Sequence, residues 1–253
     1  MLKKRIIPSL LIKNKKLVKG KEFKNYVNVG DPISAIKVYS HQYADELIFI
    51  RIDKNDPIED LLKNLNIASE NCFSPITAGG GITKFKEIEL LCKNGADKVI
   101  INSYLHENKS FLNQSTKMFG SSTIIAGIDI IKIKQDYFIS TNNNKKLLKE
   151  KKLSEWIKFL EDNGAGEILI NCIHKDGAMN GYDLELAKFI CKKTVVPIIF
   201  TGGAGNFDHL YQLFANTNVS AAGCSSIFHF GDNNPIRANT YLRNKKINLK
   251  KVK

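Results

Sequence analysis

The chain alternates short apolar runs, rich in β-branched residues, with longer amphipathic segments. We expect eight of the apolar runs to form strands, at residues 5–12, 45–50, 74–78, 97–102, 123–130, 166–171, 196–201 and 219–224. Runs that are apolar almost throughout are typical of strands buried on both faces of a parallel sheet. Helical patterns follow them, at residues 31–43, 57–71, 84–94, 106–119, 153–164, 183–193, 206–217 and 234–243. The alternation predicts an α/β fold, a single (β/α)8 TIM barrel.

An internal repeat divides the chain into two similar parts. The segments PITAGGG and PIIFTGG both close on glycines, and Gly80 and Gly203 are separated by the same 123 positions as Ser103 and Ser226. We therefore expect one domain, 1–253, made of duplicated half-barrels at about 1–122 and 123–243 and a basic C-terminal tail at 244–253. The alternative is that glycines simply recur in the turns after strands.

The segment 131–152 is longer than an ordinary connection between a strand and a helix. Alternating Tyr137 and Ile139, followed by three asparagines, indicate a small hairpin or a mobile loop above the barrel. In this fold such a position lies beside the active site.

The formal net charge of +13 first raises the question of a nucleic-acid partner. The lysines collect at 13–25, 143–152 and 244–253, among polar residues and without a binding motif, so we interpret most of them as solvated and expect no nucleic acid. They leave a modest preference for anionic ligands.

Targeting and metal signals are weak. No apolar run is long enough to span a bilayer, and the basic N-terminal segment lacks a cleavage site, so we expect neither membrane association nor secretion. The five cysteines are scattered without a C-x-x-C pair, which favours reduced, buried thiols in the cytoplasm and predicts no metal and no cofactor.

The chemistry of a TIM barrel is expected at the carboxyl ends of its strands. Glycine clusters at 79–81 and 202–205 leave backbone N–H groups open to an anion, and hydroxyl or amide groups follow the next strand in each half. Two such clusters imply a ligand with a phosphate at each end. The candidate phosphate residues from this pattern are Gly80, Gly81, Asn102, Ser103, Gly202, Gly203, Ser225 and Ser226.

Asp129 closes the fifth predicted strand and would point into the mouth of the barrel, where a carboxylate suits general acid–base catalysis. Its alternative role is to cap the following loop. Asp176 and Gly177 form another strand-end candidate, although this dipeptide is also a turn signal. For His174 we favour a hydrogen bond within its loop over proton transfer.

Four charged residues open strands at the opposite end of the barrel: Arg5, Glu46, Lys98 and Glu167. The ordinary interpretation is an ion-paired ring that closes the bottom, since this face usually serves stability. The other is a gate over an axial channel, and the sequence pattern alone does not separate the two.

Several motifs together resemble one family over essentially the whole chain: KRIIPSLLIK, LVKG, GDPI, ADEL, AGGGI, GADKVIIN, FGSS, GAGEILIN, KDGAMNGYD, PIIFTGGAG and SSIFHF. The chain resembles the cyclase subunit (HisF) of imidazole glycerol phosphate synthase. The resemblance implies an ammonia-dependent lyase that works in a heterodimer with a HisH-type glutaminase. Ammonia would enter at the bottom and reach a bisphosphate substrate at the top.

The resemblance also assigns residues. It implies that Asp129 is one of two catalytic aspartates and that the charged bottom residues form an ammonia gate. Lys19, Asp176 and Gly177 would join the phosphate clusters in binding substrate, and Asp97 would contact the glutaminase.

Two positions depart from the family pattern. Leu11 stands where the other catalytic aspartate belongs, and Arg51 stands where an acid is usual. Loss of a positioned acid or base costs about 10² to 10⁴ in rate. The first strand and the NVSAAGCSSIFHF ending resemble the glycosyl amidation-associated WbuZ branch, which implies ammonia transfer in the making of amidated surface-polysaccharide sugars, with a sugar-nucleotide or bisphosphate substrate.

Two alternatives remain open. The chain could be a genuine histidine-biosynthesis cyclase that converts the phosphoribulosyl formimino aminoimidazole carboxamide ribotide with Asp129 alone. It could also be a non-catalytic, phosphate-binding activator of the glutaminase.

Overall fold

The structure is a computed structural model that describes residues 3–250. Residues 1–2 and 251–253, which include both ends of the expected domain and the last part of the basic tail, lie outside the described residues.

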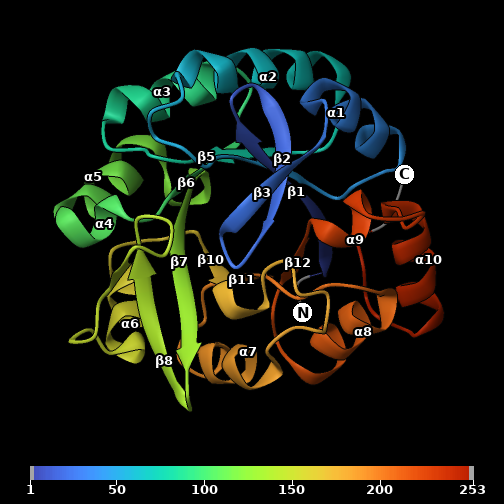
Figure 1. Ribbon diagram of the computed structural model, residues 1–253. Helices are drawn as coiled ribbons and strands as arrows, with labels where there is room; N and C mark the ends of the chain where they lie inside the picture. Colours follow the sequence, from blue (N-terminus) through green and yellow to red (C-terminus); the bar gives the residue numbers. More distant parts are fainter. Residues whose placement is uncertain (1–2, 251–253) are drawn as a thin grey trace.

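Eight parallel strands close into a barrel, which confirms the predicted fold (Figure 1). They pair in the order β1, β4, β5, β6, β7, β10, β11, β12, and β12 returns to β1 while β7 pairs with β10. Their bounds are β1 Arg5–Lys13, β4 Leu47–Arg51, β5 Ile76–Gly79, β6 Lys98–Ile101, β7 Ile124–Ile133, β10 Glu167–Cys172, β11 Ile198–Thr201 and β12 Ala221–Cys224. Each overlaps an expected strand.

Helices surround the barrel in Figure 1, and all of them overlap an expected helix except the short α9, which the sequence pattern did not predict. They are α1 Pro32–His41, α2 Ile58–Asn71, α3 Phe85–Lys93, α4 Tyr104–Glu107, α5 Ser110–Phe119, α6 Leu153–Asp162, α7 Leu184–Cys191, α8 Phe207–Asn216, α9 Ser226–His229 and α10 Pro235–Asn244. The helix expected at 106–119 is divided into α4 and α5 around Asn108, whose backbone is extended. Short 3-10 turns, η1 Ser121–Thr123 and η2 Ile173–Lys175, complete the connections.

Two hairpins extend the barrel at its carboxyl end. The expected hairpin after the fifth barrel strand is present, because β7 continues into an antiparallel pairing with β8 Asp136–Thr141, which in turn pairs with β9 Lys146–Leu147. The other hairpin, β2 Lys16–Lys21 and β3 Lys24–Gly30, was not expected from the sequence. In Figure 1 it crosses the opening of the barrel.

The barrel interior is apolar above its bottom layer. Inward-facing side chains from seven of the strands form one cluster of buried residues: Ile7, Ile48, Ile100, Ile125, Leu169, Ile199 and Ala221. A larger cluster fills the layer between the strands and the helices. Burial on both faces explains why the strands are apolar almost throughout.

The end of the chain packs against its beginning. Leu249, which is 2% exposed, pairs with Lys4 as an isolated β-bridge beyond α10. No helix in the part of the chain that the structure describes is long and apolar enough to cross a membrane.

A matched pair of phenylalanines tests the packing. Phe200 is fully buried, whereas Phe73 is fully exposed. We expect Phe200→Ala to lower the free energy of unfolding by about 3–5 kcal/mol, because it removes buried apolar surface and leaves a cavity. Phe73→Ala should change it by less than about 0.5 kcal/mol. Urea denaturation measures both, and equal effects would contradict the packing described here.

Candidate functional site

The carboxyl ends of the barrel strands surround a cavity of about 790 Å³. All the residues that the sequence assigns to catalysis or to substrate and phosphate binding line it: Lys19, Gly80, Gly81, Asn102, Ser103, Asp129, Asp176, Gly177, Gly202, Gly203, Ser225 and Ser226. These residues lie far apart in the sequence and meet because parallel barrel strands end at the same rim. The structure therefore places them in one site, and their individual roles stay predictions.

Each glycine loop needs glycine because its backbone is left-handed and crowded. At Gly80, with φ of +108°, a Cβ would lie 2.0 Å from the carbonyl oxygen of Arg51. At Gly203, with φ of +116°, a Cβ would lie 2.3 Å from the carbonyl oxygen of Gly181. A side chain at either position would therefore displace the backbone of a neighbouring segment.

Three buried oxygens at the cavity wall lack hydrogen-bond partners among the residues that the structure describes. They are Asn102 Oδ1, Asp176 Oδ2 and Ser225 Oγ. Buried polar atoms in folded proteins are almost always paired. Their convergence on one cavity indicates that a polar ligand completes them.

Asp129 lies at the centre of the site, and its side chain is buried. Asn171 Nδ2 donates to Asp129 Oδ1 at 2.6 Å, and Thr201 Oγ1 orients Asn171 by donating to its Oδ1 at 2.7 Å. Burial raises the pKa of Asp129 to about 6, against the opposing effect of hydrogen bonds from Asn171 and Asn102. A carboxyl group with this pKa can exchange a proton near neutral pH.

Lys19 and Asp176 form an ion pair on the wall of the cavity. Lys19 is 2% exposed, and its Nζ donates to Asp176 Oδ1. The pair neutralises the charge of both side chains, while Asp176 Oδ2 stays without a partner among the described residues. A ligand could therefore approach this pair without meeting an uncompensated cation.

Both departures from the family pattern line the cavity. Leu11 lies opposite Ile50 of β4 and Val18 of β2, and its side chain has no proton to give. Arg51 ends β4 beneath the first glycine loop and is only 6% exposed.

The unexpected hairpin adds Phe23 and Tyr26 to the wall of the cavity. Burial, reinforced by the charges of Asp176 and Asp129, raises the pKa of Tyr26 to about 12, so the phenol keeps its proton. The sequence signal for this hairpin is weak, since its strands are rich in lysine and its turns use non-glycine residues with positive φ, such as Glu22.

The asparagine run also reaches the cavity, from the loop between β8 and β9. The Asn142 N–H donates to Ser103 Oγ at 3.3 Å, and Asn143 Nδ2 donates to the carbonyl oxygen of Ile52 at 2.8 Å. The loop thus bridges to the ends of β4 and β6, beside the first glycine loop. Lys145 and Lys146 follow it and line the cavity, and they are exposed, as expected and as most lysines of the basic segments are.

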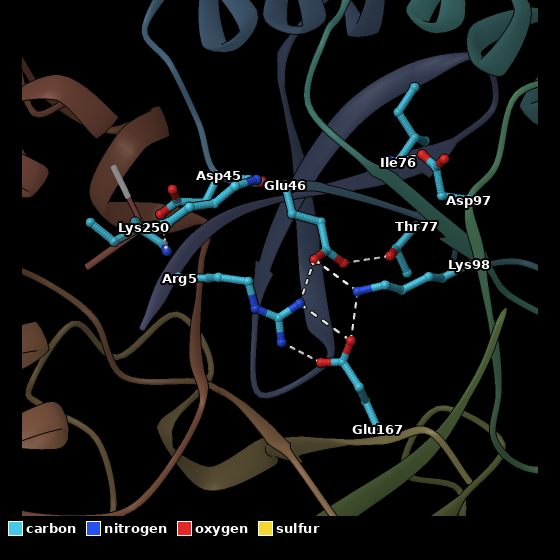
Figure 2. A network of polar contacts seen from close by, with 10 residues as sticks. Arg5, Asp45, Glu46, Ile76, Thr77, Asp97, Lys98, Glu167 and Lys250 are labelled. Carbon is cyan, nitrogen blue, oxygen red and sulfur yellow. Dashed lines mark hydrogen bonds and ion pairs between the residues drawn. The ribbon is translucent and has the colours of Figure 1, made fainter. Parts of the chain in front are cut away.

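At the bottom of the barrel, the four predicted charged residues form one ring (Figure 2). Arg5 pairs with Glu46 at 2.7 Å and also with Glu167, and Lys98 pairs with the same two carboxylates at 3.1 Å and 2.6 Å. Thr77 Oγ1 donates to the remaining oxygen of Glu46 at 2.6 Å. Two cations and two anions therefore compensate one another within the ring.

The environment of Glu167 keeps the ring charged. Burial alone would raise its pKa, but hydrogen bonds and charge from Arg5 and Lys98 outweigh burial and lower the pKa below its usual value.

The apolar layer around Ile48, Ile100 and Leu169 separates the ring from the cavity, whose floor these three residues form.

Asp97 lies beside this ring at the entrance of β6 and is exposed. Its Oδ2 accepts a hydrogen bond from the Ile76 N–H at 2.7 Å, which fixes the carboxylate at the bottom rim. Large apolar side chains are also exposed at this end of the barrel, on segments that precede the strands β4, β5, β7 and β11: Tyr43, Phe73, Met118 and Val195.

Cys172, His174 and Asp183 are close enough to suggest a metal site. The Lys132 N–H, however, donates to His174 Nδ1 at 3.1 Å. A neutral imidazole must then carry its proton on Nε2, which lies 2.9 Å from Asp183 Oδ2 and donates to it. Nε2 is thus no free ligand, and this cluster supports the loop role that we favoured for His174.

Comparison with known proteins gives a consistent result. The family described as "Histidine biosynthesis protein" matches residues 5–234. The chain is 40% identical over 234 residues to the imidazole glycerol phosphate synthase subunit HisF of Hydrogenobaculum sp. (strain Y04AAS1), covering 91% of this chain and 92% of the relative. It is 36% identical over 248 residues to the HisF subunit of Prosthecochloris aestuarii, covering 98% of each.

The raised pKa of Asp129 predicts a pH-dependent change in stability. The folded-state pKa of about 6 exceeds the ordinary 3.8, so the protonated side chain stabilises the fold below about pH 4 and this contribution is lost as pH rises through 6. Asp129→Asn does not titrate, so between about pH 4 and pH 7 its stability relative to wild type should rise by up to about 3 kcal/mol.

Urea denaturation from about pH 4 to pH 8 measures this difference. Asp136→Asn, at an exposed position of β8, is the matched control and should show no such trend. A stability difference for Asp129→Asn that does not grow with pH would contradict the buried, high-pKa carboxyl.

Proposed function

The chain belongs to the histidine biosynthesis family that contains the HisF subunits of imidazole glycerol phosphate synthase, and we propose that it is an ammonia-dependent synthase subunit. It would act within a cytoplasmic glutamine amidotransferase complex. One observation carries the proposal: two glycine loops and a buried carboxyl line a single cavity, above a closed ring of ion pairs.

The substrate would carry a phosphate at each end. The loops at Gly80–Gly81 and Gly202–Gly203 lie at the ends of β5 and β11, in opposite halves of the barrel, and each is accompanied by serine hydroxyls. Backbone N–H groups and hydroxyls together satisfy phosphate oxygens well. The unpaired oxygens of Asn102 and Asp176 would meet hydroxyl or amino groups of the substrate.

Asp129 would transfer the proton. Its buried side chain and its pKa of about 6 let it act as a base at neutral pH and return the proton as an acid. Asn171 holds the carboxyl in place from the neighbouring strand β10. Tyr26 retains its proton and would donate a hydrogen bond from the other side of the cavity.

Ammonia would arrive from a HisH-type glutaminase docked at the bottom of the barrel. Asp97 and the exposed side chains of Tyr43, Phe73 and Val195 lie on that side and would supply contacts. The ring of Arg5, Glu46, Lys98 and Glu167 would then act as a gate, since ammonia must pass between its side chains to reach the apolar interior (Figure 2).

The acceptor is the finer part of the proposal. Leu11 and Arg51 leave the cavity with one central carboxyl and one extra cation, which favours the sugar-amidation branch and a bisphosphate or sugar-nucleotide acceptor. The relatives, all named as HisF subunits, favour the alternative of a histidine-biosynthesis cyclase/lyase. A non-catalytic activator of the glutaminase is the third possibility.

Turnover of the histidine-pathway substrate with ammonium salts separates these readings. For the sugar-amidation branch we expect imidazole glycerol phosphate formation at least about 10²-fold slower than in the Hydrogenobaculum relative, because Leu11 cannot transfer a proton. Leu11→Asp should raise the rate, and Asp129→Asn should abolish what remains. Turnover at the relative's rate would overturn this reading in favour of the cyclase.

The complex with the glutaminase tests whether the barrel itself is a catalyst. If Asp129→Asn leaves glutamine-dependent product formation unchanged, the barrel is an activator and not a catalyst.

The ring has its own test in the same complex. Lys98→Met breaks two ion pairs of the ring, so we expect glutamine-dependent activity to fall several-fold more than activity with external ammonium. Lys86→Met, at an exposed position of α3, is the matched control. Equal loss of both activities would favour the structural interpretation of the ring, in which removal of one buried partner mainly destabilises the protein.

A further inference from the structure

The two glycine loops are supported by different side chains, although their backbones correspond. A Cβ at Gly80 would contact the carbonyl oxygen of Arg51 at 2.0 Å, and a Cβ at Gly202 would contact that of Cys172 at 2.5 Å. Arg51 ends β4 and Cys172 ends β10, so the two residues hold equivalent places in the two halves. One loop therefore rests on the backbone of an arginine and the other on the backbone of a cysteine.

The side chain of Arg51 holds the first loop by hydrogen bonds to the backbone of the loop. Its Nε and one terminal nitrogen donate to the carbonyl oxygen of Gly80 at 3.3 Å and 3.1 Å, and its other terminal nitrogen donates to the carbonyl oxygen of Asp56 at 2.8 Å. The carbonyl and the N–H of a peptide unit point in opposite directions. Holding the Gly80 carbonyl therefore turns the Gly81 N–H away from Arg51, and the hydrogen bonds of the described residues include none from this N–H.

The charge of Arg51 is not compensated. Within the part of the chain that the structure describes, no carboxylate lies within ion-pairing distance of this 6% exposed side chain. The exposed Lys54 lines the same wall, and its Cβ lies 3.3 Å from the position of a Gly81 Cβ. The acids at this end are Asp53, 4.0 Å from Lys13, Asp56, whose carboxylate accepts a hydrogen bond from the Asn14 N–H, and the exposed Glu107.

The second loop has no such charge. Burial raises the pKa of Cys172, so its thiol stays neutral, and Lys19 is neutralised by Asp176. The phosphate groups at the two ends of the substrate would thus experience different electrostatic fields in one cavity. A buried cation in a region of low dielectric acts more strongly on an anion than an exposed one does.

We propose that Arg51 is a positioning and charge residue that makes the first loop the stronger of the two anion sites, selective for phosphate in its dianionic form. This inference rests on the twin anion sites of the proposed function, and it adds which of the two sites binds an anion more tightly. Arg51 polarises and aims the Gly80–Gly81 peptide and contributes its unpaired charge from beneath. The more highly charged end of an unsymmetrical substrate binds at the end of β5, which fixes the direction in which the substrate lies.

Titration with inorganic phosphate at about pH 8, measured by calorimetry, tests the proposal. In wild type we expect two classes of site, with the tighter one weakened by added potassium chloride. Arg51→Met should weaken the tighter class by about 10-fold or more and leave the weaker class intact. Arg51→Lys keeps the charge but loses the paired donors, and should recover part of the affinity together with its salt dependence.

Arg237→Met removes an exposed arginine from α10 and serves as the matched control. Unchanged phosphate affinity in Arg51→Met would overturn the proposal while leaving the twin sites in place. If Arg51→Met fails to fold, Arg51→Lys decides: a tighter class of site with its wild-type affinity unchanged would equally overturn the proposal. Absence of any phosphate binding in wild type would instead remove the twin sites and the proposed function with them.

Discussion

Closure of the parallel sheet between β7 and β10 is the constraint on which the rest of the structure depends. Once the sheet is closed, every strand ends at one rim and begins at the other, so residues far apart in the sequence must meet. Asp129 and Asn171 are paired in the register of this closing contact, and the hydrogen bond between their side chains follows directly. At the other rim, Glu167 is brought opposite Arg5 and Lys98. The catalytic candidate and the ionic ring are thus two consequences of one pairing.

Buried charges are compensated differently at the two ends of the barrel interior. The bottom ring is self-neutralising, with each carboxylate shared between two cations, which suits a place where no ligand need bind. The cavity keeps charge that is not compensated by an opposite charge: the buried Asp129 has a raised pKa, and Arg51 has only backbone carbonyls for partners. Unsatisfied polar groups weaken a fold unless something else completes them. The buried oxygens of Asn102, Asp176 and Ser225 line this cavity, where a polar ligand would complete them.

The barrel and most of its site could be predicted because they follow from periodic patterns. Continuous apolar runs mark the strands, and the repeated glycines locate both loops in the sequence itself. The hairpin of β2 and β3 could not be predicted in the same way, because β3 is largely exposed and the buried part of β2 combines two apolar residues with a lysine and a glycine, so neither strand carries an apolar run. For the same reason Tyr26 was missed. The contacts of Asn171 with Asp129 and of Arg51 with Gly80 depend on register and side-chain direction, which a single sequence does not specify.

The two halves of the barrel have kept their backbones and diverged in their chemistry. Leu11 and Asp129 both line the cavity from opposite walls, and Arg51 and Cys172 support equivalent glycine loops. The glycines cannot vary in this way, because a Cβ at Gly80 or Gly203 would overlap a neighbouring backbone oxygen. Side chains beneath and between the loops are free of that restriction, so they can change the charge of a ligand site without altering its shape. Under the proposed function, the central carboxyl would set the class of reaction, while the residues that end the strands would set the choice of acceptor.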